Sequence, residues 1–215
     1  MAAIQIRALD TRVASKLANR EPTDVIVTDR MTVADAVAAI LGNLGANQLS
    51  RLTLIMHGFG VLMEGNQAQG FNVSVPLPNQ LNVSRASPNF SKIYGGYGLE
   101  FGRDNLSLDT VAPFARLKGK FTNGGLLVVF GCAAAGMGPD LGTIKGERLS
   151  GDGPRLLRQL VLLARAPVRA ADSLQQVTIN WMLDSADRGP WTGRTFLFMP
   201  DGRQIDESKI PMSVY

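Results

Sequence analysis

The chain contains one histidine and one cysteine, and both follow apolar segments. His57 comes directly after the run 52–56, and Cys132 comes after the run 126–130 and one glycine. An imidazole can take the proton of a thiol, and the resulting thiolate is a strong nucleophile. If the two runs are neighbouring parallel strands, both residues lie at the sheet edge where α/β proteins bind ligands. We therefore expect His57 and Cys132 to lie close together as a base and a nucleophile.

The order of the two residues along the chain narrows the class of enzyme. Papain-like proteases and cysteine glutaminases place the cysteine before the histidine, which disfavours both. A lipase-like hydrolase needs a glycine on each side of its nucleophile elbow, where this chain has Phe130 and Ala134, and it needs a second histidine. A structural interpretation stays open, because a lone cysteine is often a small buried hydrophobe.

The elements that position the pair follow from the periodicity of apolar residues. The segment Thr32–Asp35 has the pattern of a helix capping box, and Pro154 suits the first turn of a second long helix. The segments 64–97 and 136–153 are polar and rich in glycine, and we expect them to be loops that emerge beside the pair. Strands are expected over 4–9, 25–27, 52–56, 99–104, 125–132, 168–172 and 194–199, with helices over 33–44, from 109 and from 154.

Strands that alternate with helices predict an α/β three-layer sandwich with a mostly parallel sheet. The 215 residues, of which 45% are hydrophobic and 19% charged, suit a single domain over 1–215. One cysteine excludes a disulfide framework and a CxxC metal site. The net charge of +4 comes from scattered arginines, which favours a solvated surface over a nucleic-acid site. No leader pattern or membrane-length apolar run is present, so we expect a soluble cytoplasmic protein, although export without a leader would leave no mark.

An apolar strand ending in His-Gly, followed later by one ending in Gly-Cys, resembles the pattern of the caspase-like cysteine peptidases. The segments Leu52–Gly58 and Leu126–Cys132 carry this resemblance. It is closest to bacterial branches, such as the CHAT-type peptidases and domains of large adhesins, through Val129–Ala134. The helix from Pro154 and the strand Val168–Asp172 also match the general plan of those families.

The resemblance implies a caspase-like fold and a cysteine-dependent endopeptidase that acts on proteins, on peptides or on its own chain. Cys132 would be the nucleophile and His57 the general base and acid. The backbone N–H groups of Gly58 and Cys132 would form the oxyanion hole. The reaction would pass through a thioester, and no metal or organic cofactor is implied. Self-processing would be expected in the segment 136–153 that follows the cysteine.

One residue departs from the family pattern. Many relatives carry a polar or acidic residue two positions before the cysteine, where it lines the specificity pocket, and this chain has Phe130. Asp172 could supply that acidic group instead, while Glu64 or Asp104 could orient His57. Two alternatives remain: a catalytically inactive caspase-like binding or effector module, and an unrelated α/β enzyme with its ligand at the same sheet edge. No phosphate-binding glycine motif supports the latter.

Overall fold

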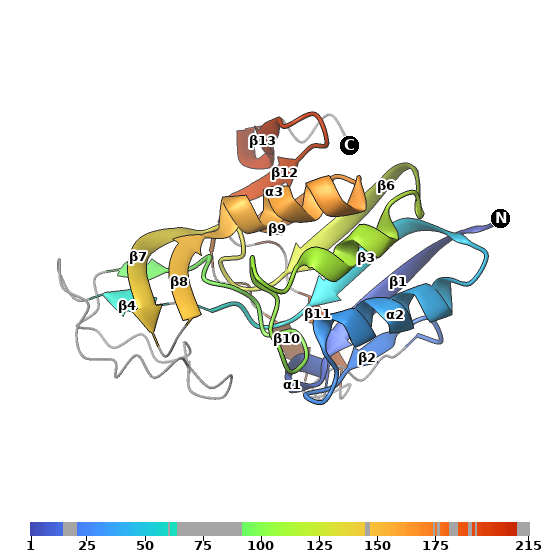
Figure 1. Ribbon diagram of the computed structural model, residues 1–215, viewed down its shortest axis with the longest axis horizontal. Helices are drawn as coiled ribbons and strands as arrows, with labels where there is room; N and C mark the ends of the chain where they lie inside the picture. The colour runs from blue at the N-terminus through green and yellow to red at the C-terminus, as the bar shows by residue number, and fades with distance from the viewer. Residues whose placement is uncertain are drawn as a thin grey trace.

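Seven strands form one mixed sheet in the order β13-β12-β9-β6-β3-β1-β2 (Figure 1). The computed structural model describes residues 1–14, 21–59, 61–63, 92–144, 147–173, 175, 177–180, 185–188, 191 and 193–209. Five strands of this sheet run parallel to one another, namely β1, β2, β3, β6 and β9. Strand β12 is antiparallel to β9, and β13 is antiparallel to β12. The predicted α/β class with a mostly parallel sheet is therefore confirmed. The strands are β1 (Ala3–Asp10), β2 (Val25–Val27), β3 (Gln48–Ile55), β6 (Phe121–Phe130), β9 (Val168–Ala171), β12 (Thr195–Phe198) and β13 (Gln204–Asp206).

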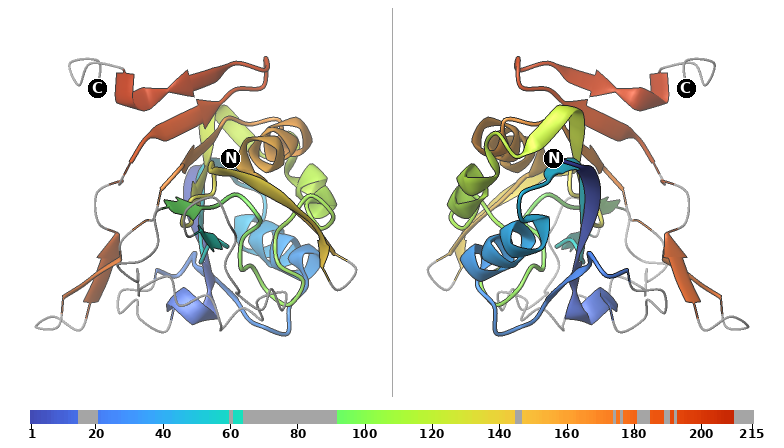
Figure 2. Two further views of the ribbon diagram at one scale, coloured as in Figure 1. Left: turned by 90° about the vertical axis from the view of Figure 1, so that its left-hand side faces the viewer. Right: turned by 90° about the vertical axis from the view of Figure 1, so that its right-hand side faces the viewer.

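Three helices cover one face of this sheet (Figure 2). They are α2 (Val33–Leu44), the 3-10 helix η1 (Ala112–Leu117) and α3 (Gly153–Ala164), and they enclose the main hydrophobic core with the inward residues of the central strands. A smaller apolar cluster lies on the opposite face, where the short helix α1 (Thr11–Ala14) contributes Val13 and Trp191 packs at the margin. Among the described residues, no helix combines the length and the apolar character needed to cross a bilayer.

The two long helices begin as their sequences predict. The backbone N–H of Asp35 donates to Thr32 Oγ1 at 3.0 Å, and the N–H of Thr32 donates back to the Asp35 carboxylate at 2.9 Å, which completes the capping box. At α3, the Asp152 carboxylate accepts from the N–H of Arg155 at 3.0 Å, with Pro154 in the first turn. Both contacts satisfy backbone donors that the helix itself leaves unpaired.

Two antiparallel hairpins project from the end of the sheet where β3 and β6 stop (Figure 1). One pairs β4 (Val61–Met63) with β5 (Lys92–Tyr94), the other pairs β7 (Met137–Ile144) with β8 (Glu147–Asp152), and β5 contacts β7. A third hairpin joins β10 (Val177–Asn180) to β11 (Ser185–Arg188), and the 3-10 helix η2 (Glu207–Lys209) follows β13.

Two expectations for these connections were wrong. The segment 136–153 was expected to be a loop, yet most of it forms the β7–β8 hairpin. Each strand of a two-stranded hairpin has one unpaired edge, so Gly138 and Pro139 are tolerated there. The segment 99–104 was expected to be a strand, yet it makes only isolated bridges at Leu99. Its apolar residues Leu99 and Phe101 are buried in the core, and this burial gives an irregular segment the hydrophobic pattern expected of a strand. In the other expected loop, 64–97, Lys92–Tyr94 form the short strand β5, and residues 64–91 lie outside the described residues.

Replacing Thr32 by alanine should lower the free energy of unfolding by about 1 kcal/mol, because the N–H of Asp35 loses its acceptor. Urea unfolding measures this loss. Thr32→Ser keeps the hydroxyl and is the matched control, with a stability close to that of the wild type. Equal stability of the alanine and serine variants would show that the cap contributes nothing.

Candidate active site

His57 and Cys132 lie at the same edge of the sheet because β3 and β6 are paired in parallel. Ile55 pairs with Phe130 at the end of the two strands, and the N–H of Met56 donates to the carbonyl of Phe130 at 3.2 Å. His57 and Cys132 each lie two residues beyond that last pair, so they occupy equivalent positions just past the ends of neighbouring strands. His57 is exposed and Cys132 is half-buried.

The backbone of Gly58 lies directly against the backbone of Cys132. A Cβ atom at Gly58 would stand 1.8 Å from the carbonyl oxygen of Cys132 and 2.8 Å from its carbonyl carbon. Such an atom cannot be accommodated without moving one strand end away from the other. Glycine at position 58 is therefore a requirement of the close approach between the two halves of the candidate site.

The turn that carries Cys132 is held from two sides. The N–H of Ala133 donates to the carbonyl of Ser173, and the N–H of Ala135 donates to the carbonyl of Ala171, both at 2.8 Å. On the other side, a Cβ at Gly95 would lie 2.2 Å from the Ala133 side chain, so the chain after β5 packs tightly on the turn. Ala133 has a left-handed φ of +50°, which costs about 1 kcal/mol for a residue with a side chain. These contacts hold it in that conformation.

The thiol of Cys132 donates to the carbonyl oxygen of Gln175 at 3.6 Å. Gln175 is itself buried, and its side-chain amide donates to the carbonyl of Ser173 at 2.9 Å. The sulfur thus lies against the segment that follows β9. A reaction at the sulfur requires the side chain to leave this acceptor.

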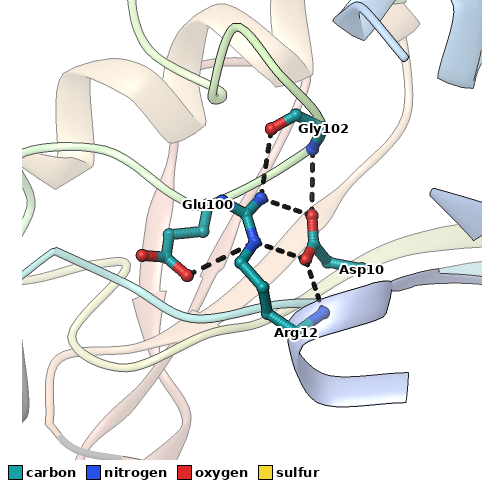
Figure 3. A network of polar contacts seen from close by, with 4 residues as sticks. All are labelled: Asp10, Arg12, Glu100 and Gly102. Atoms are coloured by element: carbon teal, nitrogen blue, oxygen red, sulfur yellow. Dashed lines mark hydrogen bonds and ion pairs between the residues drawn. The ribbon is translucent and has the colours of Figure 1, made fainter. Parts of the chain in front are cut away.

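A buried ionic cluster lies beside this edge, at the end of the neighbouring strand β1 (Figure 3). Asp10 is fully buried and accepts two hydrogen bonds from the Arg12 guanidinium, both at 2.6 Å, and one from the N–H of Gly102 at 2.9 Å. Arg12 also donates to the carbonyl of Gly102 at 3.1 Å, and its Nε lies 3.5 Å from a carboxylate oxygen of Glu100. Two carboxylates therefore share one guanidinium.

Glu100 is the member of the cluster that connects to His57. Its N–H donates to the carbonyl of His57 at 2.8 Å, and its side chain is buried. Burial raises the pKa of Glu100 from its ordinary value of 4.5 to about 7, with Asp10 adding to the rise and Arg12 opposing it. Burial alone would lower the pKa of Arg12, but the hydrogen bond and charge of Asp10 raise it, so the guanidinium stays charged.

The other predicted site residues that the structure describes have partners of their own. Phe130 is only 4% exposed and packs edge-on against Trp191, with ring centroids 5.1 Å apart. The Asp172 carboxylate accepts from the Nε of Arg194 at 2.9 Å, so its charge is already paired. Asp104 is paired with Arg103 at 3.0 Å, and Glu64 lies outside the described residues.

Asp10, Arg12 and Glu100 were not anticipated from the sequence. A usable signal existed for the first two, since an Asp-x-Arg segment follows the strand expected over 4–9. Glu100 stands between two large apolar residues, which is a sign of a buried charge. Within the part of the chain that the structure describes, no group of three or more His, Cys, Asp or Glu side chains could hold a metal ion.

Comparison with protein-family models, with curated proteins and with solved structures found no match.

Replacing Gly58 by alanine should destabilise the protein by about 1–3 kcal/mol, the usual cost of forcing an atom into a filled space. Gly42 in α2 is the matched control, because a Cβ there would meet nothing within 4 Å. Gly42→Ala should stabilise the protein by up to about 1 kcal/mol through helix propensity. Denaturant unfolding of both variants checks the pair, and equal effects at the two positions would contradict the close approach.

Replacing Glu100 by glutamine should change the dependence of stability on pH. Because the folded state raises the pKa of Glu100 from 4.5 to about 7, its contribution to stability is fully present below pH 4.5 and is lost as the pH rises through 7. Glutamine does not titrate. The free energy of unfolding of the variant, relative to that of the wild type, should therefore increase as the pH rises from 5 to 8. The increase should be up to about 3 kcal/mol.

Urea unfolding of wild type and Glu100→Gln at pH 5 and pH 8 measures this gain, since the other titrating groups cancel in the difference. A stability difference that does not vary with pH would mean that Glu100 titrates normally.

Proposed function

We propose that this protein is a cysteine-dependent endopeptidase of caspase-like fold that acts on protein substrates or on its own chain. The observation that carries the proposal is the equivalent placement of His57 and Cys132 at adjacent ends of β3 and β6. The contact between Gly58 and Cys132 supports it, because it brings the two strand ends as close as backbones allow. The mostly parallel sheet, with an antiparallel pair after β9, is compatible with the caspase-like arrangement.

The reaction would be acyl transfer in two steps. His57 takes the thiol proton of Cys132, and the sulfur attacks the carbonyl carbon of the peptide bond to form a tetrahedral intermediate. The N–H groups of Gly58 and Cys132 would stabilise its oxyanion. The imidazolium then protonates the departing amine, which leaves a thioester on Cys132 and a free amino terminus. A water molecule, deprotonated by His57, hydrolyses the thioester and regenerates the thiol.

The exposed position of His57 suits this role, because the imidazole must reach both the thiol and the leaving group of a substrate. The contact of the thiol with the Gln175 carbonyl belongs to the resting state. Sulfur rotates away from that carbonyl when it attacks, and the turn around Ala133 can stay in place during this movement.

A catalytically inactive binding or effector module is the second candidate. The observation that favours it is the same thiol contact, because a cysteine that donates to a buried backbone carbonyl behaves as a structural residue. In that case the exposed edge around His57 would bind a protein partner without cleaving it.

An electrophilic activity-based probe with a peptidyl acyloxymethyl ketone separates the two candidates. Such a probe alkylates the nucleophile of a cysteine peptidase, so mass spectrometry should find one adduct, at Cys132. His57→Ala should slow the labelling by about 10²-fold or more, the contribution expected of a general base. Asp201→Asn, at an exposed carboxylate paired with Arg203, is the control and should label as the wild type does.

Equal labelling rates in the wild type and His57→Ala would show that the histidine does not activate the thiol. The inactive binding module would then be the better description of the protein.

A further inference from the structure

Residues Leu99–Gly102 form a buried strap between the end of β3 and the end of β1. At one end, Leu99 bridges with Gly58, and the N–H of Glu100 donates to the carbonyl of His57 at 2.8 Å. At the other end, Gly102 donates to the Asp10 carboxylate at 2.9 Å and accepts from Arg12 at 3.1 Å. The strap therefore ties the backbone of His57 to the buried ionic cluster.

The Glu100 side chain reaches the cluster from the middle of the strap. One carboxylate oxygen lies 3.5 Å from the Nε of Arg12, while the other points away from the guanidinium (Figure 3). Asp10 already receives both strong hydrogen bonds of the guanidinium fork. The attraction between Glu100 and Arg12 is therefore the weaker of the two ion pairs, and it is the one that can be released without breaking the other.

We propose that Glu100 is a positioning residue for His57: its side chain, neutral and buried beside Arg12, keeps the strap against the end of β1, and the strap sets the place of His57 beside Cys132. The effect on the thiol rests on the proposed function. The effect on the backbone of His57 does not, because it follows from the hydrogen bond between Glu100 and the His57 carbonyl.

The charge on Glu100 makes this positioning dependent on pH. The charged groups that act on Glu100 are Arg12 from α1, which favours its ionised form, and Asp10 from β1, which opposes it. Asp29, before α2, acts on Arg12 from a greater distance. Glu100 loses its proton near pH 7, and burial disfavours the carboxylate more than Arg12 favours it. The strap is therefore held most firmly below pH 7, where Glu100 is neutral, and is loosened above it.

The first test is the rate at which iodoacetamide alkylates Cys132, the only thiol of the chain. Glu100→Gln should react about tenfold faster than the wild type at pH 8.5, because the neutral amide keeps the strap closed and His57 in place as the general base. At pH 5.5 the two proteins should react alike, since the wild-type carboxyl is then neutral as well. Asp201→Asn, at an exposed carboxylate paired with Arg203, is the matched control, and its rate should equal that of the wild type at both pH values.

A double-mutant cycle shows whether the effect passes through His57. In a His57→Ala background, Glu100→Gln should leave the alkylation rate unchanged, whereas a general loosening of the fold would slow or speed it in both backgrounds. Arg12→Lys, which keeps the charge but loses the fork, should slow alkylation, in the opposite direction to Glu100→Gln.

Hydrogen exchange of the amide at position 100 gives a readout that needs no catalysis. This amide donates to His57, and it should exchange about tenfold more slowly in Glu100→Gln than in the wild type at pH 8. If His57→Ala slows alkylation and Glu100→Gln reacts as the wild type does, the positioning role is overturned while the proposed function stands. If His57→Ala has no effect, the proposed function has failed, and unchanged exchange at position 100 would then overturn the positioning role separately.

Discussion

The parallel pairing of β3 with β6 is the constraint on which the candidate site depends. Both strands run in the same direction and end at one register pair, Ile55 with Phe130, so the residues that follow emerge side by side. A slip of one residue in this register would turn the side chains of one strand to the other face of the sheet and would separate the pair. The flanking strands reinforce the register, because β1 and β9 pair in parallel on either side and bring the ionic cluster and the Ser173–Gln175 segment to the same edge.

Much of the fold was predictable because its signals are local. The capping box at Thr32 and the proline in the first turn of α3 act on neighbouring backbone groups, so a short stretch of sequence contains the whole cause. The β7–β8 hairpin was missed for the opposite reason. Its composition suits a loop, and its strands exist through pairing with each other and packing beside β5. The segment after Gly98 was mistaken for a strand because burial under a connection and burial in a sheet select the same apolar residues.

The candidate site also has one part that could be predicted from local signals and one part that could not. His57 and Cys132 could be found because each is unique in the chain and each ends an apolar run. The cluster beside them left local signals in the sequence, but its assembly could not be predicted, since Asp10 and Glu100 are distant in sequence and meet through Arg12. Ionised Glu100 lowers stability and, on our proposal, loosens the strap that holds His57, so the order of this edge of the sheet depends on pH.

The hydrogen bond between Gly102 and Asp10 joins residues that are 92 positions apart. Contacts of such long sequence separation form only after the chain between them has closed, and here that chain includes β2, α2 and β3. We expect the strap to be put in place late in folding, once the central strands have paired. Its residues Leu99 and Phe101 belong to the main hydrophobic core, so the strap should open together with the core between the sheet and its helices. The protein would thus acquire an organised His57 late in folding and lose it when the core opens, which makes the edge of the sheet a reporter of global unfolding.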